Sequence, residues 1–146
     1  MKRFLFLLSL ALFFTACKST SSIVTSKKTT SKEKSTRSEK RKTNQLADQL
    51  VDVATENLGV KYKYAGTTKD GFDCSGLIYT VYNSENIVLP RNSAQQSKVG
   101  VVLNQKKDQA QKGDLIFFKT NKSREINHVG IVIEVSNEEI KFIHSS

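Results

Sequence analysis

The hydrophobic pattern of this chain changes partway along its length, and this change restricts the fold class. In residues 44–83 the apolar residues recur at the spacing of helices, as in Leu46, Leu50, Ala54 and Leu58. After residue 100, short runs of β-branched and aromatic residues follow instead, separated by polar segments. Helices that precede the strands, rather than alternating with them, predict an α+β domain whose helices pack on one face of an antiparallel sheet.

Two helices are predicted in the first half of this domain. Thr43 or Asn44 can cap the first helix, and Gly59 follows its last apolar residue, where a glycine commonly ends a helix. The second helix covers Cys74–Asn83 and carries an apolar stripe. Between the two helices, Val60–Tyr64 alternates as an extended segment and leads into a loop.

Four strands are predicted in the second half, after a short polar segment around Gln95 and Gln96. We interpret Leu89-Pro90-Arg91 and Gly113-Asp114 as turn and packing residues rather than catalytic residues. The predicted strands are Val101–Leu103, Leu115–Phe118, His128–Val135 and Ile140–His144.

The N-terminus has the pattern of a secretory signal. Lys2 and Arg3 precede the apolar run Phe4–Phe14, which is shorter than the roughly 20 residues that a membrane-spanning helix needs. Thr15-Ala16-Cys17 then resembles the lipobox of bacterial lipoproteins, in which the cysteine becomes the lipidated first residue. This resemblance implies a signal peptide over residues 1–17, lipidation of Cys17, and a protein anchored by lipid to the cell envelope, at the outer membrane or its periplasmic face. The alternative is an uncleaved signal with an incidental cysteine.

The net charge of +9 lies almost entirely outside the expected domain. Residues 18–43 carry nine Lys and Arg against two Glu, whereas residues 44–146 carry twelve basic and twelve acidic residues. The basic stretch is rich in Ser and Thr and has no aromatic residue, so we predict a disordered tether. The tether either rests on anionic lipid or cell-wall polymer or is only a soluble spacer. The neutral domain argues against nucleic-acid binding.

Cys74 is the first candidate for catalysis. Gly71-Phe72-Asp73-Cys74-Ser75-Gly76 places its thiol at the first turn of a helix, where unpaired N–H groups and the helix dipole favour a thiolate. The chain has two cysteines, so lipidation of Cys17 leaves Cys74 as a lone thiol in an oxidising compartment, and its retention calls for a reason. A helix-borne cysteine followed by a strand-borne histidine is the order of papain-like peptidases. The alternative is a buried cysteine that acts as a small hydrophobic residue.

A wider resemblance covers most of residues 44–146. Six segments occur in one order: Tyr62-Lys63-Tyr64-Ala65-Gly66, Asp73-Cys74-Ser75-Gly76-Leu77, Leu89-Pro90-Arg91-Asn92-Ser93, Gly113-Asp114-Leu115-Ile116-Phe117-Phe118, Asn127-His128-Val129-Gly130-Ile131 and Phe142-Ile143-His144. Each segment alone is a weak signal, but together they resemble the NlpC family of papain-like cell-wall cysteine peptidases.

The resemblance implies a papain-like α+β fold and the hydrolysis of peptide bonds in the stem peptides of murein (peptidoglycan), as in D,L-endopeptidases. Cys74 would be the nucleophile, His128 the base, and Tyr62 would offer its hydroxyl to the oxyanion. Asp73 and Ser75 would hold the amino end of the substrate in members that demand a free one. The alternatives are structural: Tyr62 would be a packed ring, and Asp73 would be a helix N-cap.

His144 matches the third polar residue of the family, which orients the base. A tight turn between the last two strands pairs Glu134 with Lys141, and a regular ladder from there places His144 opposite Ile131. That register puts His144 and His128 on opposite faces of the sheet, because parity decides the face. A β-bulge, or His128 lying just outside the regular strand, would bring them to one face. Otherwise His144 is a structural histidine.

The expected peptidase is a monomer that needs no cofactor or metal, since two histidines and one thiol in this order do not match a closed zinc site. The family domain usually continues beyond its third polar residue, whereas this chain ends at Ser146, so we expect the C-terminal strands to be missing. This shortness favours an alternative, a catalytically inactive lipoprotein module that binds the cell wall. The joint presence of Cys74, His128 and Tyr62 favours the peptidase.

Overall fold

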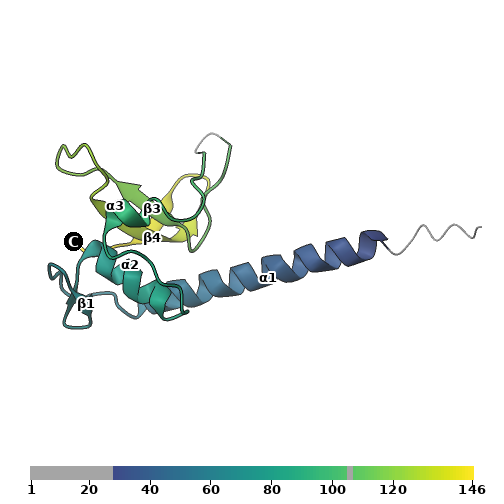
Figure 1. The fold of residues 1–146 in the computed structure, drawn as a ribbon, viewed down its shortest axis with the longest axis horizontal. Helices are drawn as coiled ribbons and strands as arrows, with labels where there is room; N and C mark the ends of the chain where they lie inside the picture. The colour runs from purple at the N-terminus through teal and green to yellow at the C-terminus, as the bar shows by residue number, and fades with distance from the viewer. Residues whose placement is uncertain (1–27, 105–106) are drawn as a thin grey trace, which may run out of the picture. The chain divides into compact units, whose positions relative to one another are not determined.

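The computed structural model describes residues 28–104 and 107–146 (Figure 1). The predicted signal peptide, the lipidation site Cys17 and the first part of the tether lie outside the described residues. A two-strand hairpin, a three-stranded antiparallel sheet in the order β3-β4-β5, and helices make up the fold. The elements are α1 (Lys28–Thr55), β1 (Thr67–Thr68), β2 (Gly71–Phe72), α2 (Cys74–Asn83), α3 (Ser93–Gln96), β3 (Leu115–Phe118), β4 (His128–Val135) and β5 (Ile140–Ile143).

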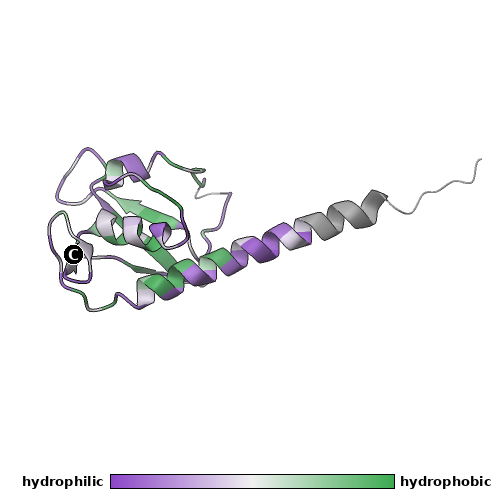
Figure 2. Ribbon diagram, turned by 60° about the horizontal axis from the view of Figure 1, so that its bottom comes forward, coloured by the Kyte–Doolittle hydropathy of each residue, from purple (hydrophilic) through white to green (hydrophobic). Residues whose placement is uncertain are grey.

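The hydrophobic core joins the helices to one face of the three-stranded sheet. Ile78 and Val81 of α2 are fully buried, and they belong to one cluster with Val129 and Ile131 of β4. The last turns of α1 add further buried residues to this cluster, among them Ala54. Figure 2 shows the apolar residues gathered in the strands and in these last turns. The predicted α+β class, with helices on an antiparallel sheet, is therefore confirmed.

Helix α1 begins at Lys28, well before the predicted start at Thr43 or Asn44. It therefore includes residues 28–43, which composition assigned to a disordered tether. The physical reason is local: every residue from 36 to 45 is exposed, so burial does not hold this part, whereas Lys, Arg and Glu propagate a helix well. The buried turns from Leu46 onward supply the nucleus, and each residue added to an existing helix costs little.

Helix α2 and strand β4 have the predicted bounds. The extended segment before the hairpin is also present, where Tyr62 forms a parallel bridge with Phe72. The predicted strand Val101–Leu103 is wrong, because these residues form no strand and Val101 is 90% exposed. Their β-branched side chains favour a strand, but no neighbouring strand pairs with them within the described residues.

A β-bulge between β4 and β5 changes which residues share a face. The predicted pair of Glu134 and Lys141 is present, and the two side chains form a salt bridge of 3.2 Å. The register then shifts between Val132 and Glu134, so that Ile131 lies opposite Ile143 instead of His144. The regular-ladder prediction for His144 is therefore wrong, and the bulge is the device that moves His144 to the other face.

The buried and exposed valines offer a matched test of this core. Val81→Ala removes two methyl groups from a side chain that is 0% exposed in α2, and we expect it to lower the free energy of unfolding by about 2 kcal/mol. Val101→Ala makes the same chemical change at a side chain that is 90% exposed, and we expect a change within about 0.5 kcal/mol. Urea unfolding of both variants measures the difference. Equal losses would contradict the core described above.

Candidate active site

The start of α2 holds Cys74 in a capped turn. Strand β2 leads directly into Asp73, which has extended backbone angles and acts as the N-cap of α2. Its Oδ1 accepts a hydrogen bond of 2.7 Å from the backbone N–H of Gly76. The thiol of the half-buried Cys74 lies 4.0 Å from the carbonyl oxygen of Asn127. The nucleophile predicted from sequence thus occupies the first residue of a well-capped helix, where the N-terminal dipole favours an anion.

His128 and His144 contact each other directly. His128 is the first residue of β4 and His144 directly follows β5, and the bulge described above places both on one face. His128 Nε2 lies 2.9 Å from His144 Nδ1, so one of these nitrogens carries the proton that the two share. The rings meet edge to face at 85°. Burial lowers the pKa of His128, and the neighbouring His144 lowers it further.

The segment after β5 is tied to the nucleophile turn. The hydroxyl of the buried Ser145 donates a 2.8 Å hydrogen bond to the carbonyl oxygen of Phe72, the residue before Asp73. This bond joins the residue after His144 to the strand that precedes Cys74. The position of the second histidine is therefore coupled to that of the thiol.

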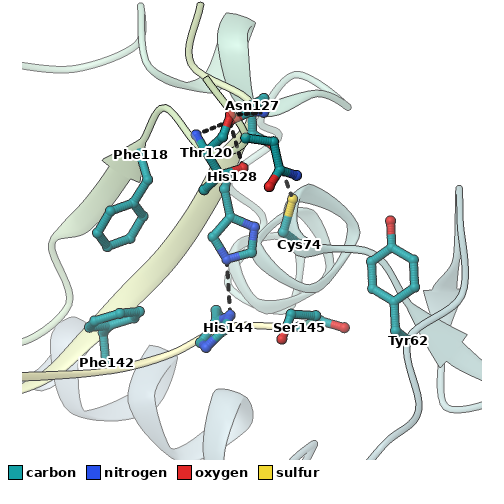
Figure 3. A pocket seen from close by; sticks show the side chains of 11 residues that line it. Tyr62, Cys74, Phe118, Thr120, Asn127, His128, Phe142, His144 and Ser145 are labelled. Carbon is teal, nitrogen blue, oxygen red and sulfur yellow. Dashed lines mark hydrogen bonds between the residues drawn. The ribbon is translucent and has the colours of Figure 1, made fainter. Parts of the chain in front are cut away.

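A pocket of about 540 Å³ brings the predicted catalytic residues together (Figure 3). Tyr62, Cys74, His128 and His144 all line it. Figure 3 shows the His128 ring with Nε2 turned to His144 and with Nδ1 on the side of Cys74. Tyr62 is 50% exposed, so its ring is not a packed core ring. A thiol, an imidazole pair and a phenol around one open pocket can perform nucleophilic acyl transfer.

The aromatic wall of the pocket stands beside the histidines. Phe118 of β3 and Phe142 of β5 have ring centroids 5.3 Å apart, and both line the pocket. Phe118 also lies 6.0 Å from the ring of His128, and Phe142 lies 5.4 Å from the ring of His144. These rings shield the histidine pair from water on one side, which agrees with the lowered pKa of His128.

Asp73 and Ser75 lie outside the pocket lining and form hydrogen bonds with Arg91. Both are buried, and neither lines the pocket. Arg91 donates to Asp73 Oδ1 at 2.9 Å, to Asp73 Oδ2 at 2.8 Å and to Ser75 Oγ at 3.1 Å. Burial raises the pKa of Asp73, but the hydrogen bonds from Arg91 and from Gly76 N outweigh it, so that the pKa lies below its usual value.

Two residues of the site were missed in the sequence. The sequence analysis interprets Arg91 as a turn residue, although a buried carboxylate at Asp73 favours a cationic partner and so signals one. Asn127 was quoted only as the neighbour of His128. Its side chain accepts from Thr120 N at 2.8 Å and donates to Thr120 O at 3.2 Å, which holds the loop before β4 in place.

Residues 28–104 and 107–146 contain neither a metal-binding cluster nor a membrane-spanning helix. No group of three or more His, Cys, Asp or Glu residues in these ranges is arranged to hold a metal ion. Within the same ranges, no helix combines the length and the apolar character that crossing a bilayer requires.

Comparisons with known proteins agree on one family. The model of the NlpC/P60 family matches residues 59–146. A gamma-D-glutamyl-L-lysine dipeptidyl-peptidase of Bacillus cereus is 42% identical over 100 residues, which are 68% of this chain and 28% of that protein. The probable endopeptidase NlpC of Escherichia coli is 39% identical over 108 residues, which are 69% of this chain and 66% of that protein.

Solved structures agree with the sequence comparisons. A crystal structure of an NlpC/P60 family protein from Bacillus cereus matches with a TM-score of 0.57 and 36% identity, over 67% of this chain and 34% of that one. A lipoprotein-like NLP/P60 protein from Staphylococcus aureus matches with a TM-score of 0.58 and 33% identity, over 70% and 34%. This chain spans less than two thirds of each of these proteins. The resemblance found in the sequence is confirmed, and the chain belongs to the NlpC/P60 family.

Proposed function

We propose that this chain is a cysteine peptidase that hydrolyses peptide bonds in the stem peptides of peptidoglycan, as D,L-endopeptidases do. The observation that carries the proposal is the joint position of Cys74 and the His128–His144 pair around one pocket. The names of relatives support the substrate: a gamma-D-glutamyl-L-lysine dipeptidyl-peptidase and, at 28% identity, a murein DD-endopeptidase of Escherichia coli.

Cys74 attacks the scissile carbonyl as a thiolate. The carbon–sulfur bond forms while the carbonyl π electrons move to oxygen, which makes a tetrahedral oxyanion. The backbone N–H of Cys74 and the hydroxyl of Tyr62 are the proposed hydrogen-bond donors to this charge, since both residues line the pocket. The N–H of Gly76 is already bonded to Asp73 and takes no part.

His128 moves the protons. When its Nε2–H donates to His144 Nδ1, its own Nδ1 is free to take the proton of Cys74 and later to give it to the leaving amine. As the oxyanion collapses, the carbon–nitrogen bond breaks, the amine leaves with that proton, and a thioester to Cys74 remains. Water, deprotonated by the same nitrogen, then attacks the thioester. The carbon–sulfur bond breaks, the acid product leaves, and the sulfur takes back the proton from His128. His144 orients the base by fixing its tautomer, as the third member of a triad does.

The role of Asp73 and Ser75 in holding the amino end of the substrate stays a prediction from the sequence, because both side chains are buried and neither lines the pocket. Asp73 Oδ2 accepts a hydrogen bond from Arg91, and a carboxylate oxygen can accept a second donor such as an ammonium group. Both residues lie in the turn that carries Cys74, which would set a short distance from the amino end to the scissile bond.

The proposed location at the cell envelope rests on the signal pattern and on the predicted lipidation of Cys17.

Digestion of purified murein by the full chain tests the peptidase. We expect release of stem-peptide fragments, identified by mass, and Cys74→Ala to lower the rate at least about a thousandfold because it removes the nucleophile. Cys17→Ala removes the other thiol of the chain and is the matched control, with full activity expected in solution. If no version cleaves but the chain sediments with murein, the cell-wall-binding module is the correct function.

Replacing His144 tests the orienting role. His144→Ala removes the partner of His128 Nε2, and we expect kcat to fall about a hundredfold or more. His144→Asn keeps a side-chain oxygen that can accept from Nε2, so its loss should be smaller. A kcat for His144→Ala within twofold of the wild type would leave His144 a structural residue only.

The lowered pKa of His128 also predicts a pH dependence of stability. As the pH falls below 6.5, the unfolded chain binds a proton at this histidine before the folded chain does. Its contribution to stability is therefore present above pH 6.5 and is lost as the pH falls through the pKa of the folded state. In urea unfolding at pH 7.5 and 5.5, wild type should lose more stability than His128→Gln. Equal losses in the two proteins would contradict the direction of the shift.

A further inference from the structure

Arg91 connects the residues on both sides of the nucleophile. Its two terminal nitrogens grip both carboxylate oxygens of Asp73, the residue before Cys74, at 2.8 and 2.9 Å. One nitrogen also donates to the hydroxyl of Ser75, the residue after Cys74, at 3.1 Å. The other donates to the carbonyl oxygen of Gly66 at 3.2 Å. A single planar guanidinium thus bonds two side chains and one backbone carbonyl around the thiol.

The same segment makes a second contact with this turn. Gln96 is 1% exposed, and its Nε2 donates to the carbonyl oxygen of Ser75 at 3.0 Å and to that of Pro90 at 2.8 Å. The turn is also close-packed, since a Cβ at Gly76 would overlap the carbonyl oxygen of Gly66 and lie 3.0 Å from Arg91. The first turn of α2 therefore has little room to shift without moving Arg91.

The charges around Cys74 pose a conflict that Arg91 resolves. The carboxylate of Asp73 caps α2, but a negative charge next to the nucleophile opposes formation of a thiolate. The side chain of Asp73 is 12% exposed, so solvent screens this charge poorly. Arg91 places a cation on both carboxylate oxygens, which cancels most of the repulsion and leaves the cap in place.

We propose that Arg91 is a positioning residue of the peptidase: through Asp73 it holds the first turn of α2 and keeps the local field favourable to the Cys74 thiolate. This inference rests on the proposed role of Cys74 as nucleophile. The hydrogen bond with Asp73 raises the pKa of Arg91 above its usual value although burial lowers it, and the charges of Asp73 and of the nearby Cys74 raise it further.

The titratable groups that face Cys74 come from several elements. Asp73 and Arg91 lie on the side of the helix turn, whereas His128, His144 and Tyr62 line the pocket. Replacing Asp73 or Arg91 leaves the side chains of the three pocket residues in place. A shift in thiol reactivity that reverses its sign between these two replacements therefore comes from their charges.

The pH profile of Cys74 alkylation by iodoacetamide measures this effect on the purified full chain, with the peptide that contains Cys74 followed by mass. Arg91→Gln leaves the Asp73 charge uncompensated, and we expect the midpoint of the profile to rise by about one pH unit, a tenfold slower alkylation below both midpoints. Asp73→Asn keeps a side chain that caps helices equally well but leaves the Arg91 cation uncompensated. Its midpoint should fall below that of the wild type.

Two further variants separate geometry from charge. Arg91→Lys keeps the cation but not the planar fork, so we expect a midpoint near that of the wild type and a kcat on murein reduced about tenfold. Lys112→Gln breaks the exposed 2.6 Å salt bridge with Asp48 and should change neither quantity.

Midpoints that move in one direction for Arg91→Gln and Asp73→Asn, or that do not move, would overturn the proposal. If Arg91→Gln fails to fold, the direction in which Asp73→Asn moves the midpoint of the alkylation profile decides the test. Alkylation needs no substrate, so a chain that shows opposite shifts but cleaves no murein would retain the Arg91 inference and lose the peptidase.

Discussion

The packing of α2 (Cys74–Asn83) against β4 (His128–Val135) is the contact on which the site depends. The proposed nucleophile, Cys74, is the first residue of the helix, and the proposed base, His128, is the first residue of the strand. The two ends therefore meet only if these elements are held together. Buried residues of both, among them Ile78 and Ile131, form that contact inside one core. The burial of apolar side chains between α2 and β4 therefore positions the residues of the site at the ends of these elements.

A single β-bulge determines whether His144 can contact His128. Side chains alternate along a strand, so one extra residue between Val132 and Glu134 transfers His144 to the face of His128. The bounds of α2 and β4 could be predicted because periodicity and an N-cap are local signals. The bulge could not, because it depends on the balance of pairing, turn geometry and packing across two strands. The sequence indicated only that a bulge, or a His128 outside the regular strand, would bring the two histidines to one face.

Local propensity explains where the other predictions failed. The turns of α1 before Leu46 are helical without burial, and the strand expected at Val101–Leu103 has suitable residues but no partner among the described residues. Arg91 was missed for a related reason: its partner Asp73 is 18 residues away, and no periodic pattern links the two. Sequence patterns indicate elements and candidate residues, whereas pairings across the fold come from packing.

The choice of cap explains why an ion pair stands at this position. Asn or Ser caps a helix as well as Asp does, and a neutral cap beside a thiolate would need no compensating cation. A partly buried ion pair is also weak evidence for stability, since desolvation offsets much of its attraction. The ion pair of Asp73 and Arg91 instead fixes geometry. Arg91 binds the carboxylate of Asp73 in a bidentate manner, and its guanidinium also donates to Ser75 and Gly66. The charged cap is therefore better explained by the position of the nucleophile than by the stability of the helix.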